Sequence, residues 1–143
     1  MRIIFITAAF IVAACSQVKP AVTSDPHPVV LAHVEAFNVQ DAKAMAEVEH
    51  PDIEWLTATG SEILVEVSGR ENLTKSMEEF FKSPTKIAGT LRDWSVNGNY
   101  IAVTETAHWS TSSGEAKSQS ALTVYQLEDN LIRRVWYYPS VEN

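Results

Sequence analysis

The segment from Tyr100 to Asn143 constrains the fold more than any other part of the chain. It contains three runs rich in β-branched and aromatic residues, YIAVTETAHWS, EAKSQSALTVYQL and LIRRVWYYPS, separated by the turn-forming clusters TSSG and EDN. This pattern is typical of antiparallel strands joined by short turns, a β-meander. Because apolar residues occupy both faces of the predicted strands, another layer has to cover one face, and the segments upstream are expected to supply it.

Two helices are expected at the start of the domain. Residues 29–38 carry apolar side chains at helical spacing, and His33 belongs to the same stripe. Residues 42–49 follow Asp41, a residue type that caps helix N-termini, and Pro51 is expected to end this second helix. Both helices are predicted to pack one apolar face against the sheet.

A third helix is predicted after a Ser-Gly-Arg-Glu segment, in which Ser68 would be the N-cap residue and Glu71 its partner in a capping box. Besides the meander, strands are predicted over residues 53–57, 62–67 and 86–96. The order of elements is therefore two helices, two strands, one helix and four strands. It predicts one α+β domain, with helices packed on a sheet that contains the antiparallel meander.

The N-terminus carries the pattern of a targeting sequence. Arg2 precedes an apolar stretch over residues 3–12, which is shorter than the roughly twenty residues of a membrane-spanning helix. The sequence VAAC that follows resembles the lipobox of bacterial lipoproteins. The resemblance implies removal of residues 1–14, acylation of Cys15 and anchoring in the bacterial cell envelope. Ser16 after the cysteine is similar to the pattern of outer-membrane lipoproteins whose domain faces the periplasm. The alternative is an ordinary signal peptide cut elsewhere, with Cys15 incidental.

Residues 15–28 are expected to form a flexible tether. They contain Pro20, Pro26 and Pro28 among polar residues, and they hold little that could be buried. The folded domain is then expected over residues 29–143.

Composition excludes several classes of function. The chain of 143 residues has 18 acidic and 11 basic residues, a net charge of −7 that offers no basic surface to nucleic acid. Its single cysteine excludes an internal disulfide and an all-cysteine metal site. No other spacing matches a zinc or iron site, so we expect no metal. We also expect no cofactor, and the acidic charge predicts no nucleic-acid partner.

Three segments resemble one superfamily: VVLAHVEAFNVQDAKAMAEV at the start, GREN at the third helix, and LTVYQLEDNLIRRVWYYP at the end. They are similar to the nuclear transport factor 2-like domains, which include ketosteroid isomerases and SnoaL-like polyketide cyclases. The resemblance covers residues 29–139 and implies a cone-shaped α+β fold, in which helices pack on a strongly bent, mostly antiparallel sheet and leave a pocket between the two layers. It does not imply one function, because this fold hosts unrelated activities. Pro139 departs from the family pattern, in which the last strand often ends in Tyr-Tyr-Asp.

The residues of a ketosteroid isomerase are not retained. Overlay on the family pattern places the isomerase tyrosine at His33, the catalytic base at Thr57, and the protonated aspartate near Ser120 or Ala121. A threonine hydroxyl has no useful basicity near neutral pH, so that mechanism is excluded.

Glu105 is the one carboxylate on an otherwise apolar face of its strand, and His33 could reach the same cavity. As a pair they are weak candidates for catalysis, or for contact with a ligand. The main expectation from the sequence is simpler: Glu105 forms a cross-strand ion pair with Arg92, Arg133 or Arg134.

Aromatic residues are abundant for a domain of this size. They are expected to form the core, and Trp55 and Trp109 are also expected to line a pocket with His33 and Glu105. The favoured function is therefore a lipid-anchored, non-catalytic domain that binds a small apolar or aromatic molecule, or a partner protein. The alternative is an isomerase, cyclase or dehydratase acting on a carbonyl compound.

The last strand also predicts a homodimer. Strict alternation places large apolar side chains on both of its faces, and helices can cover only one of them. One face would carry Leu131, Val135 and Tyr137, and the other Ile132, Trp136 and Tyr138.

Overall fold

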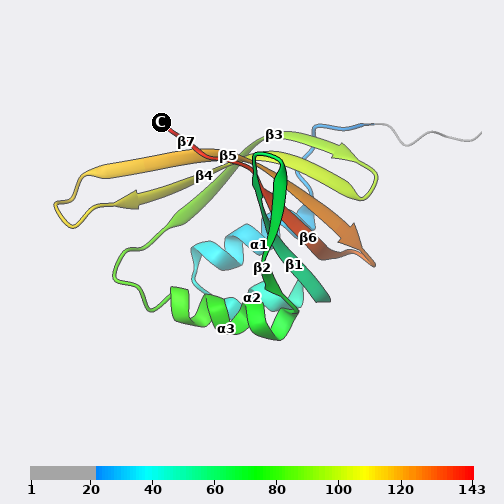
Figure 1. The fold of residues 1–143 in the computed structure, drawn as a ribbon, viewed down its shortest axis with the longest axis horizontal. Helices are drawn as coiled ribbons and strands as arrows, with labels where there is room; N and C mark the ends of the chain where they lie inside the picture. The colour runs from blue at the N-terminus through cyan, green and yellow to red at the C-terminus, as the bar shows by residue number, and fades with distance from the viewer. Residues whose placement is uncertain (1–21) are drawn as a thin grey trace, which may run out of the picture.

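Three helices lie in the hollow of a curved sheet (Figure 1). The computed structural model describes residues 22–143, so the predicted signal peptide, Cys15 and the first part of the tether lie outside the described residues. The helices are α1 (Pro28–Asn38), α2 (Ala42–Glu47) and α3 (Arg70–Phe80). The strands are β1 (Glu49–Thr59), β2 (Glu62–Ser68), β3 (Ala88–Asn97), β4 (Tyr100–Ser110), β5 (Ala116–Glu128), β6 (Leu131–Tyr137) and β7 (Val141–Glu142). The predicted order is confirmed, and β7 is an added strand.

The predicted meander is the centre of the sheet. The strand order is β2-β1-β6-β5-β4-β3, with β4, β5 and β6 pairing antiparallel in succession. Only the β1–β6 pair within this path is parallel, and the short β7 lies beside the first half of β5. The α+β class and the mostly antiparallel sheet are thus confirmed. Within residues 22–143, no helix is long and apolar enough to cross a membrane.

A β-bulge in β6 corrects the predicted faces of this strand. Leu127 pairs with Ile132 and Gln126 pairs with Arg134, so Arg133 is an extra residue on the β6 side. A bulge reverses the alternation of side chains, and both Ile132 and Val135 are consequently buried in the core. The prediction that they lie on opposite faces was wrong. Tyr138 remains exposed.

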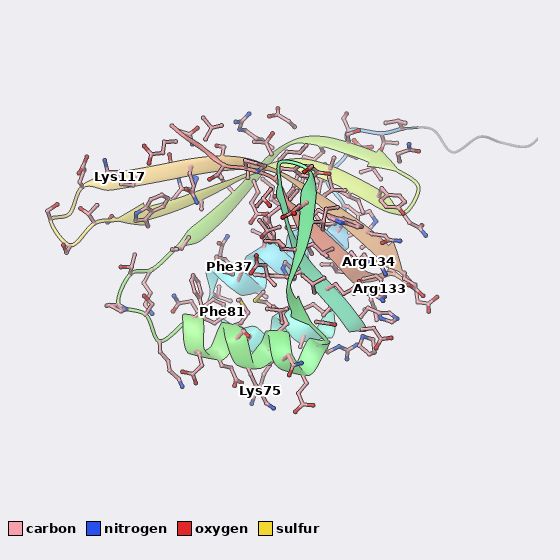
Figure 2. The ribbon with its side chains drawn as sticks, viewed as in Figure 1. Phe37, Lys75, Phe81, Lys117, Arg133 and Arg134 are labelled. Carbon is pink, nitrogen blue, oxygen red and sulfur yellow. The ribbon has the colours of Figure 1, made fainter. Side chains whose placement is uncertain are left out.

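The core lies between the helices and the inner face of the sheet. Its fully buried side chains include Val30, Met45, Ile53, Leu73, Ile101, Val103, Tyr125, Ile132 and Val135. Phe37 of α1 and Phe81 after α3 meet edge to face, with ring centroids 5.5 Å apart, and close one end of this core (Figure 2). Packing of this kind explains why the apolar stripes of α1 and α3 could be recognised in the sequence.

Pro51 lies inside β1 rather than at the end of a helix. Helix α2 ends at Glu47, and β1 begins at Glu49. The ladder between β1 and β6 is interrupted between Glu49 and Glu54. Proline, which has no N–H group, is tolerated where strand pairing is interrupted. The prediction that the helix continues through Glu49 was therefore wrong, and Glu49 is a strand residue whose side chain is buried.

The start of α3 also differs from the prediction. Gly69, not Ser68, is the N-cap residue, and no side chain caps this terminus. Ser68 still belongs to β2, where it pairs with Glu54. The chain turns from strand to helix at Gly69, whose φ of 87° is readily adopted by glycine. The capping-box prediction for Ser68 and Glu71 was wrong because strand pairing holds Ser68 in place.

The end of α1 is fastened to β3 by one side chain. Asn38 accepts a hydrogen bond from Gly89 N (2.7 Å) and donates one to Gly89 O (2.9 Å). Gly89 permits this approach, since a Cβ there would lie 3.2 Å from Val34 Cγ1 and 3.8 Å from Glu105 Oε1. The contact fixes the distance between α1 and the strand pair that carries Glu105.

We predict that Asn38→Ala lowers the free energy of unfolding by about 1–3 kcal/mol, because it leaves a partly buried N–H and C=O of Gly89 unpaired. Asn72→Ala is the control, since Asn72 makes one exposed hydrogen bond to Ser68 O. Urea denaturation of both variants provides the measurement. If Asn38→Ala lowers the free energy of unfolding no more than Asn72→Ala does, the two hydrogen bonds between Asn38 and Gly89 do not have the stabilising role assigned to them.

Candidate functional site

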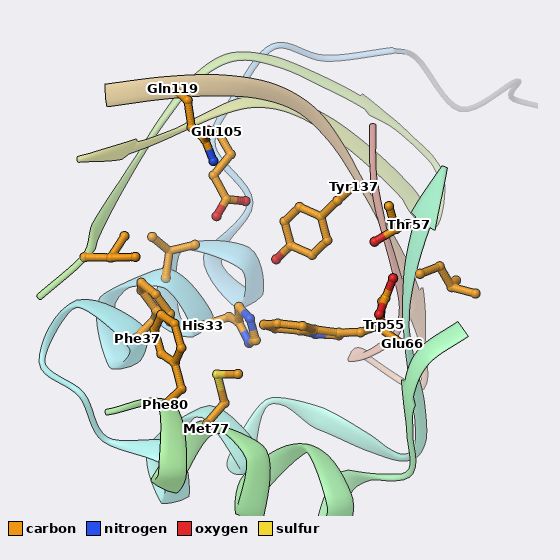
Figure 3. Close-up of a pocket in the computed structure, with 13 residues that line it drawn as sticks. His33, Phe37, Trp55, Thr57, Glu66, Met77, Phe80, Glu105, Gln119 and Tyr137 are labelled. Carbon is orange, nitrogen blue, oxygen red and sulfur yellow. The ribbon is translucent and has the colours of Figure 1, made fainter. Parts of the chain in front are cut away.

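A pocket of about 430 Å³ opens between α1, α3 and the inner face of the sheet (Figure 3). Most of its wall is apolar or aromatic, contributed by Val34, Phe37, Trp55, Leu56, Met77, Phe80 and Ile87. The polar wall residues are His33, Thr57, Glu66, Glu105, Gln119 and Tyr137. An apolar cavity with a few polar groups directed inward is the usual form of a small-molecule site.

The structure brings three of the four predicted site residues together. His33 from α1, Trp55 from β1 and Glu105 from β4 all line the pocket. Trp109 does not, contrary to expectation. It lies near the end of β4, in a separate surface hollow with His108 and Lys117. Trp109 is on the same strand face as Glu105, but the strand extends beyond the part of the sheet that lines the pocket.

Glu105 is not ion-paired, and the prediction of a cross-strand salt bridge was wrong. Its carboxylate accepts a hydrogen bond from the Tyr125 hydroxyl at 2.9 Å. The arginines have other partners: Arg92 pairs with Asp93, and Arg133 and Arg134 both pair with Glu54. Within the part of the chain that the structure describes, no cation forms an ion pair with Glu105.

Burial determines the protonation of this wall. It raises the pKa of Glu105 above its ordinary value, and the hydrogen bond from Tyr125 only partly opposes the shift. Burial also raises the pKa of Tyr137 well above the usual value, so that its hydroxyl stays protonated and can donate a hydrogen bond. In Figure 3 the Glu105 carboxylate and the Tyr137 hydroxyl point into the same space, above the rings of His33 and Trp55.

His33 and Glu49 form a second polar pair on the opposite side of the pocket, where His33 is part of the wall and Glu49 lies behind it. Nδ1 of His33 is 3.5 Å from Oε1 of Glu49, and their side chains are 4% and 1% exposed. Neither Nδ1 nor either carboxylate oxygen has a hydrogen-bond partner within the normal distance. The His33 ring is held edge-on against Trp55 and Tyr125, with centroid distances of 6.4 Å and 6.2 Å.

Burial disfavours the charged form of both members of this pair. It lowers the pKa of His33 to about 4 and raises that of Glu49 to about 7, with the positive charge of Arg70 partly opposing the latter shift. Near neutral pH His33 is therefore uncharged, and Glu49 exchanges between acid and carboxylate.

We predict that Glu49→Gln becomes more stable relative to the wild type as pH rises from 4.5 to about 7. Over this range the folded wild type binds more protons at Glu49 than the unfolded chain does, so its free energy of unfolding falls with pH. Across this range, the free energy of unfolding of Glu49→Gln should rise by about 3 kcal/mol relative to that of the wild type. His33 is present in both proteins, and so its own titration is largely cancelled.

Urea denaturation at several pH values measures this difference. Glu47→Gln, the same change at an exposed position on α2, is the control and should follow the wild type. A constant difference between Glu49→Gln and the wild type across the range would contradict the assignment of a buried, titrating Glu49.

Sequence reasoning missed Glu49, Tyr137 and the bond from Tyr125. The sequence pattern predicts a helix that ends at Glu49. His50 precedes Pro51, and a residue before a proline disfavours helical backbone, so this signal places the end of α2 before His50. For Tyr137, strand alternation predicts only the face of the last strand on which it lies, and not a place in the pocket. The Tyr125–Glu105 bond joins strands at positions that are not directly paired, because Glu105 faces Ala121, and no short-range pattern reveals it.

The positions that the isomerase overlay singled out are partly in the pocket. His33 and Thr57 line it. Ser120 does not, because its hydroxyl contacts Thr106 and Asn143 instead. Among residues 22–143, no group of three or more histidine, cysteine, aspartate or glutamate side chains is placed to hold a metal ion.

Comparison with known sequences gives one match. The family model described as a SnoaL-like domain matches residues 30–135, which include α2, α3, all but the first two residues of α1, and every strand except β7 and the end of β6. None of the curated proteins has a sequence that matches this chain.

Solved structures with the same fold include proteins of different kinds. An LEH-like epoxide hydrolase of M. tuberculosis has a TM-score of 0.64 at 12% identity, covering 77% of this chain and 78% of its own. The candidate polyketide cyclase IdmH of Streptomyces antibioticus has a TM-score of 0.63 at 18% identity, covering 80% and 89%. A candidate ketosteroid isomerase of Kribbella flavida has a TM-score of 0.61 at 16% identity, covering 80% and 78%. At these identities the likeness shows a shared nuclear transport factor 2-like fold.

Proposed function

This chain belongs to the SnoaL-like family, and from that premise and the geometry of its pocket we propose that it binds a small, largely apolar molecule carrying a carbonyl or hydroxyl group. The main support for the proposal is the position of Glu105, a carboxylate that is hydrogen-bonded to Tyr125 but forms no ion pair with the described residues, in an apolar pocket of about 430 Å³. Aromatic rings would hold the apolar body of the ligand, and Glu105 and Tyr137 would bind its polar group.

A catalytic role for the same wall is the second candidate. A desolvated carboxylate of raised pKa next to a phenol that stays protonated is a suitable acid–base pair. On a carbonyl compound, Glu105 would take a proton from the carbon next to the carbonyl group. The electron pair of that C–H bond would move to the carbonyl oxygen, which Tyr137 would stabilise by donating a hydrogen bond. In an isomerisation, the proton would return to a different carbon of a conjugated enolate. In a cyclisation, the enolate carbon would attack a second carbonyl carbon of the same molecule, and the oxygen of that group would take up the electron pair of its C=O bond and the proton from Glu105.

We predict that 2-naphthol, an aromatic molecule with one hydroxyl group, quenches tryptophan fluorescence and raises the melting temperature by mass action. Trp55→Phe should remove most of the quenching, because Trp55 is in the pocket wall. Trp109→Phe is the matched control and should keep it, since Trp109 lies in another hollow. Equal loss in both variants, or no binding by the wild type, would count against the pocket as the site.

We further predict that the protein accelerates exchange of the α-protons of 1-tetralone for deuterium in D₂O, followed by NMR. Glu105→Gln should reduce this rate by about a hundredfold or more, because it removes the base and keeps the shape of the side chain. Glu35→Gln, on the exposed side of α1, is the control. Binding without exchange would leave the binding function standing and remove the catalytic one.

We also propose that the domain is anchored in the bacterial outer membrane through acylated Cys15, facing the periplasm. The support is the VAAC sequence at the end of the apolar stretch of residues 3–12. Intact-mass measurement of the protein from membranes tests the proposal: two or three acyl chains on Cys15 support it, and an unmodified cysteine overturns it.

We propose further that the outer face of the sheet forms a homodimer. Leu122 and Tyr138 are large residues exposed there, and a 3.1 Å hydrogen bond from Tyr138 N to Leu122 O holds them side by side as one patch. Sedimentation of the protein as a monomer at micromolar concentration would reject the proposal.

A further inference from the structure

One polar pair at the pocket has no part in the function proposed above. His33 lines the pocket, while Glu49 lies behind it and is 1% exposed. Nδ1 of His33 and both carboxylate oxygens of Glu49 are buried, and none of them has a hydrogen-bond partner among residues 22–143. Buried polar atoms are nearly always satisfied, so this arrangement requires an account.

We propose that Glu49 is a positioning residue that selects the tautomer of His33. When Glu49 is a carboxylate, His33 presents Nε2 to the pocket as a hydrogen-bond acceptor. When Glu49 is a carboxylic acid, His33 presents Nε2–H as a donor.

Nδ1 of His33 lies 3.5 Å from Oε1 of Glu49, and among residues 22–143 neither atom has a closer hydrogen-bond partner. A carboxylate can only accept, so Nδ1 must carry the proton and Nε2 is left with its lone pair. A carboxylic acid can donate to Nδ1, and the proton of the neutral ring is then on Nε2.

The ring has little freedom to escape this choice by rotation. His33 is 3% exposed, and its ring packs edge-on against Trp55 and Tyr125. The change is therefore expected in the position of one proton, with the ring orientation unchanged.

The charges around the pair set the pH at which the change occurs. Burial raises the pKa of Glu49 to about 7, and Arg70 at the start of α3 partly opposes this. Tyr137 of β6 is the other titratable group that interacts with Glu49, and it stays protonated because its pKa is raised. His33 itself stays uncharged above pH 4 or so, since burial lowers its pKa to about 4.

This inference deepens the proposed function of the same pocket and names a feature of the ligand. Glu105 and His33 come from different elements, β4 and α1, and both line the pocket. A molecule with two polar groups, such as an aromatic hydroxy-ketone, could contact both. The tautomer of His33 would decide whether its second group must be a donor or an acceptor.

Nitrogen-15 NMR of the histidine rings in the ligand-free protein tests the proposal directly. His33 is assigned by comparison with His33→Gln. His50 is an internal reference, because its Nδ1 accepts a hydrogen bond from Asp52 N at 3.1 Å and its neutral ring must carry the proton on Nε2. We expect the His33 proton to move from Nε2 to Nδ1 between about pH 5.5 and about pH 8.5, with the ring neutral throughout.

Two variants and a ligand pair complete the test. Glu49→Gln should abolish the pH dependence of the tautomer, and Glu47→Gln should retain it. The ligand pair is 6-hydroxy-1-tetralone, whose second polar group is a donor, and 6-methoxy-1-tetralone, whose second polar group is an acceptor. The ratio of their affinities should change by about tenfold over the same pH range in the wild type, and not in Glu49→Gln.

A wild-type tautomer that is the same at both pH values, or that still changes in Glu49→Gln, overturns the proposal. This outcome differs from failure of the proposed function, because the NMR measurement needs no ligand. Binding of 2-naphthol with an unchanging tautomer rejects only the role of Glu49. A changing tautomer without binding rejects only the pocket as a ligand site.

Discussion

The close approach of α1 to β3 at Gly89 is the contact on which the site depends. Asn38 holds both backbone polar groups of Gly89, and the missing side chain leaves room for Val34 and for the carboxylate of Glu105. This contact fixes one side of α1 against the sheet. The same helix carries His33, whose ring packs edge-on against Trp55. Both residues line the pocket.

The pocket combines an apolar lining with two polar units that have little access to water. One is Glu105 with Tyr125 and Tyr137 on the sheet, and the other is His33 with Glu49 between α1 and β1. Desolvation shifts the pKa of each acid upward and that of His33 downward. All these shifts favour uncharged groups, as expected for the neutral organic ligand that we propose.

The sequence predicted those parts of the fold that depend on local pattern. The meander from Tyr100, the apolar stripe containing His33 and the order of elements all follow from periodicity and turn residues. Features set by pairing between distant strands were missed. The bulge at Arg133, the place of Pro51 inside β1 and the partner of Glu105 each depend on register, which no single segment encodes. Trp109 was misplaced because strand alternation gives the face but not the position along the strand.

The central claim is that Glu105 is a desolvated carboxyl group in a ligand pocket. Carbon-13 NMR titration of the glutamate carboxyl groups, with Glu105 assigned from Glu105→Gln, measures its pKa in the free protein. The account predicts a midpoint above the ordinary value of 4.5, and a further change of the Glu105 signal when 2-naphthol is added. A midpoint at or below 4.5 with no response to the ligand would contradict the account, since it would mean a solvated or ion-paired carboxylate with no pocket before it.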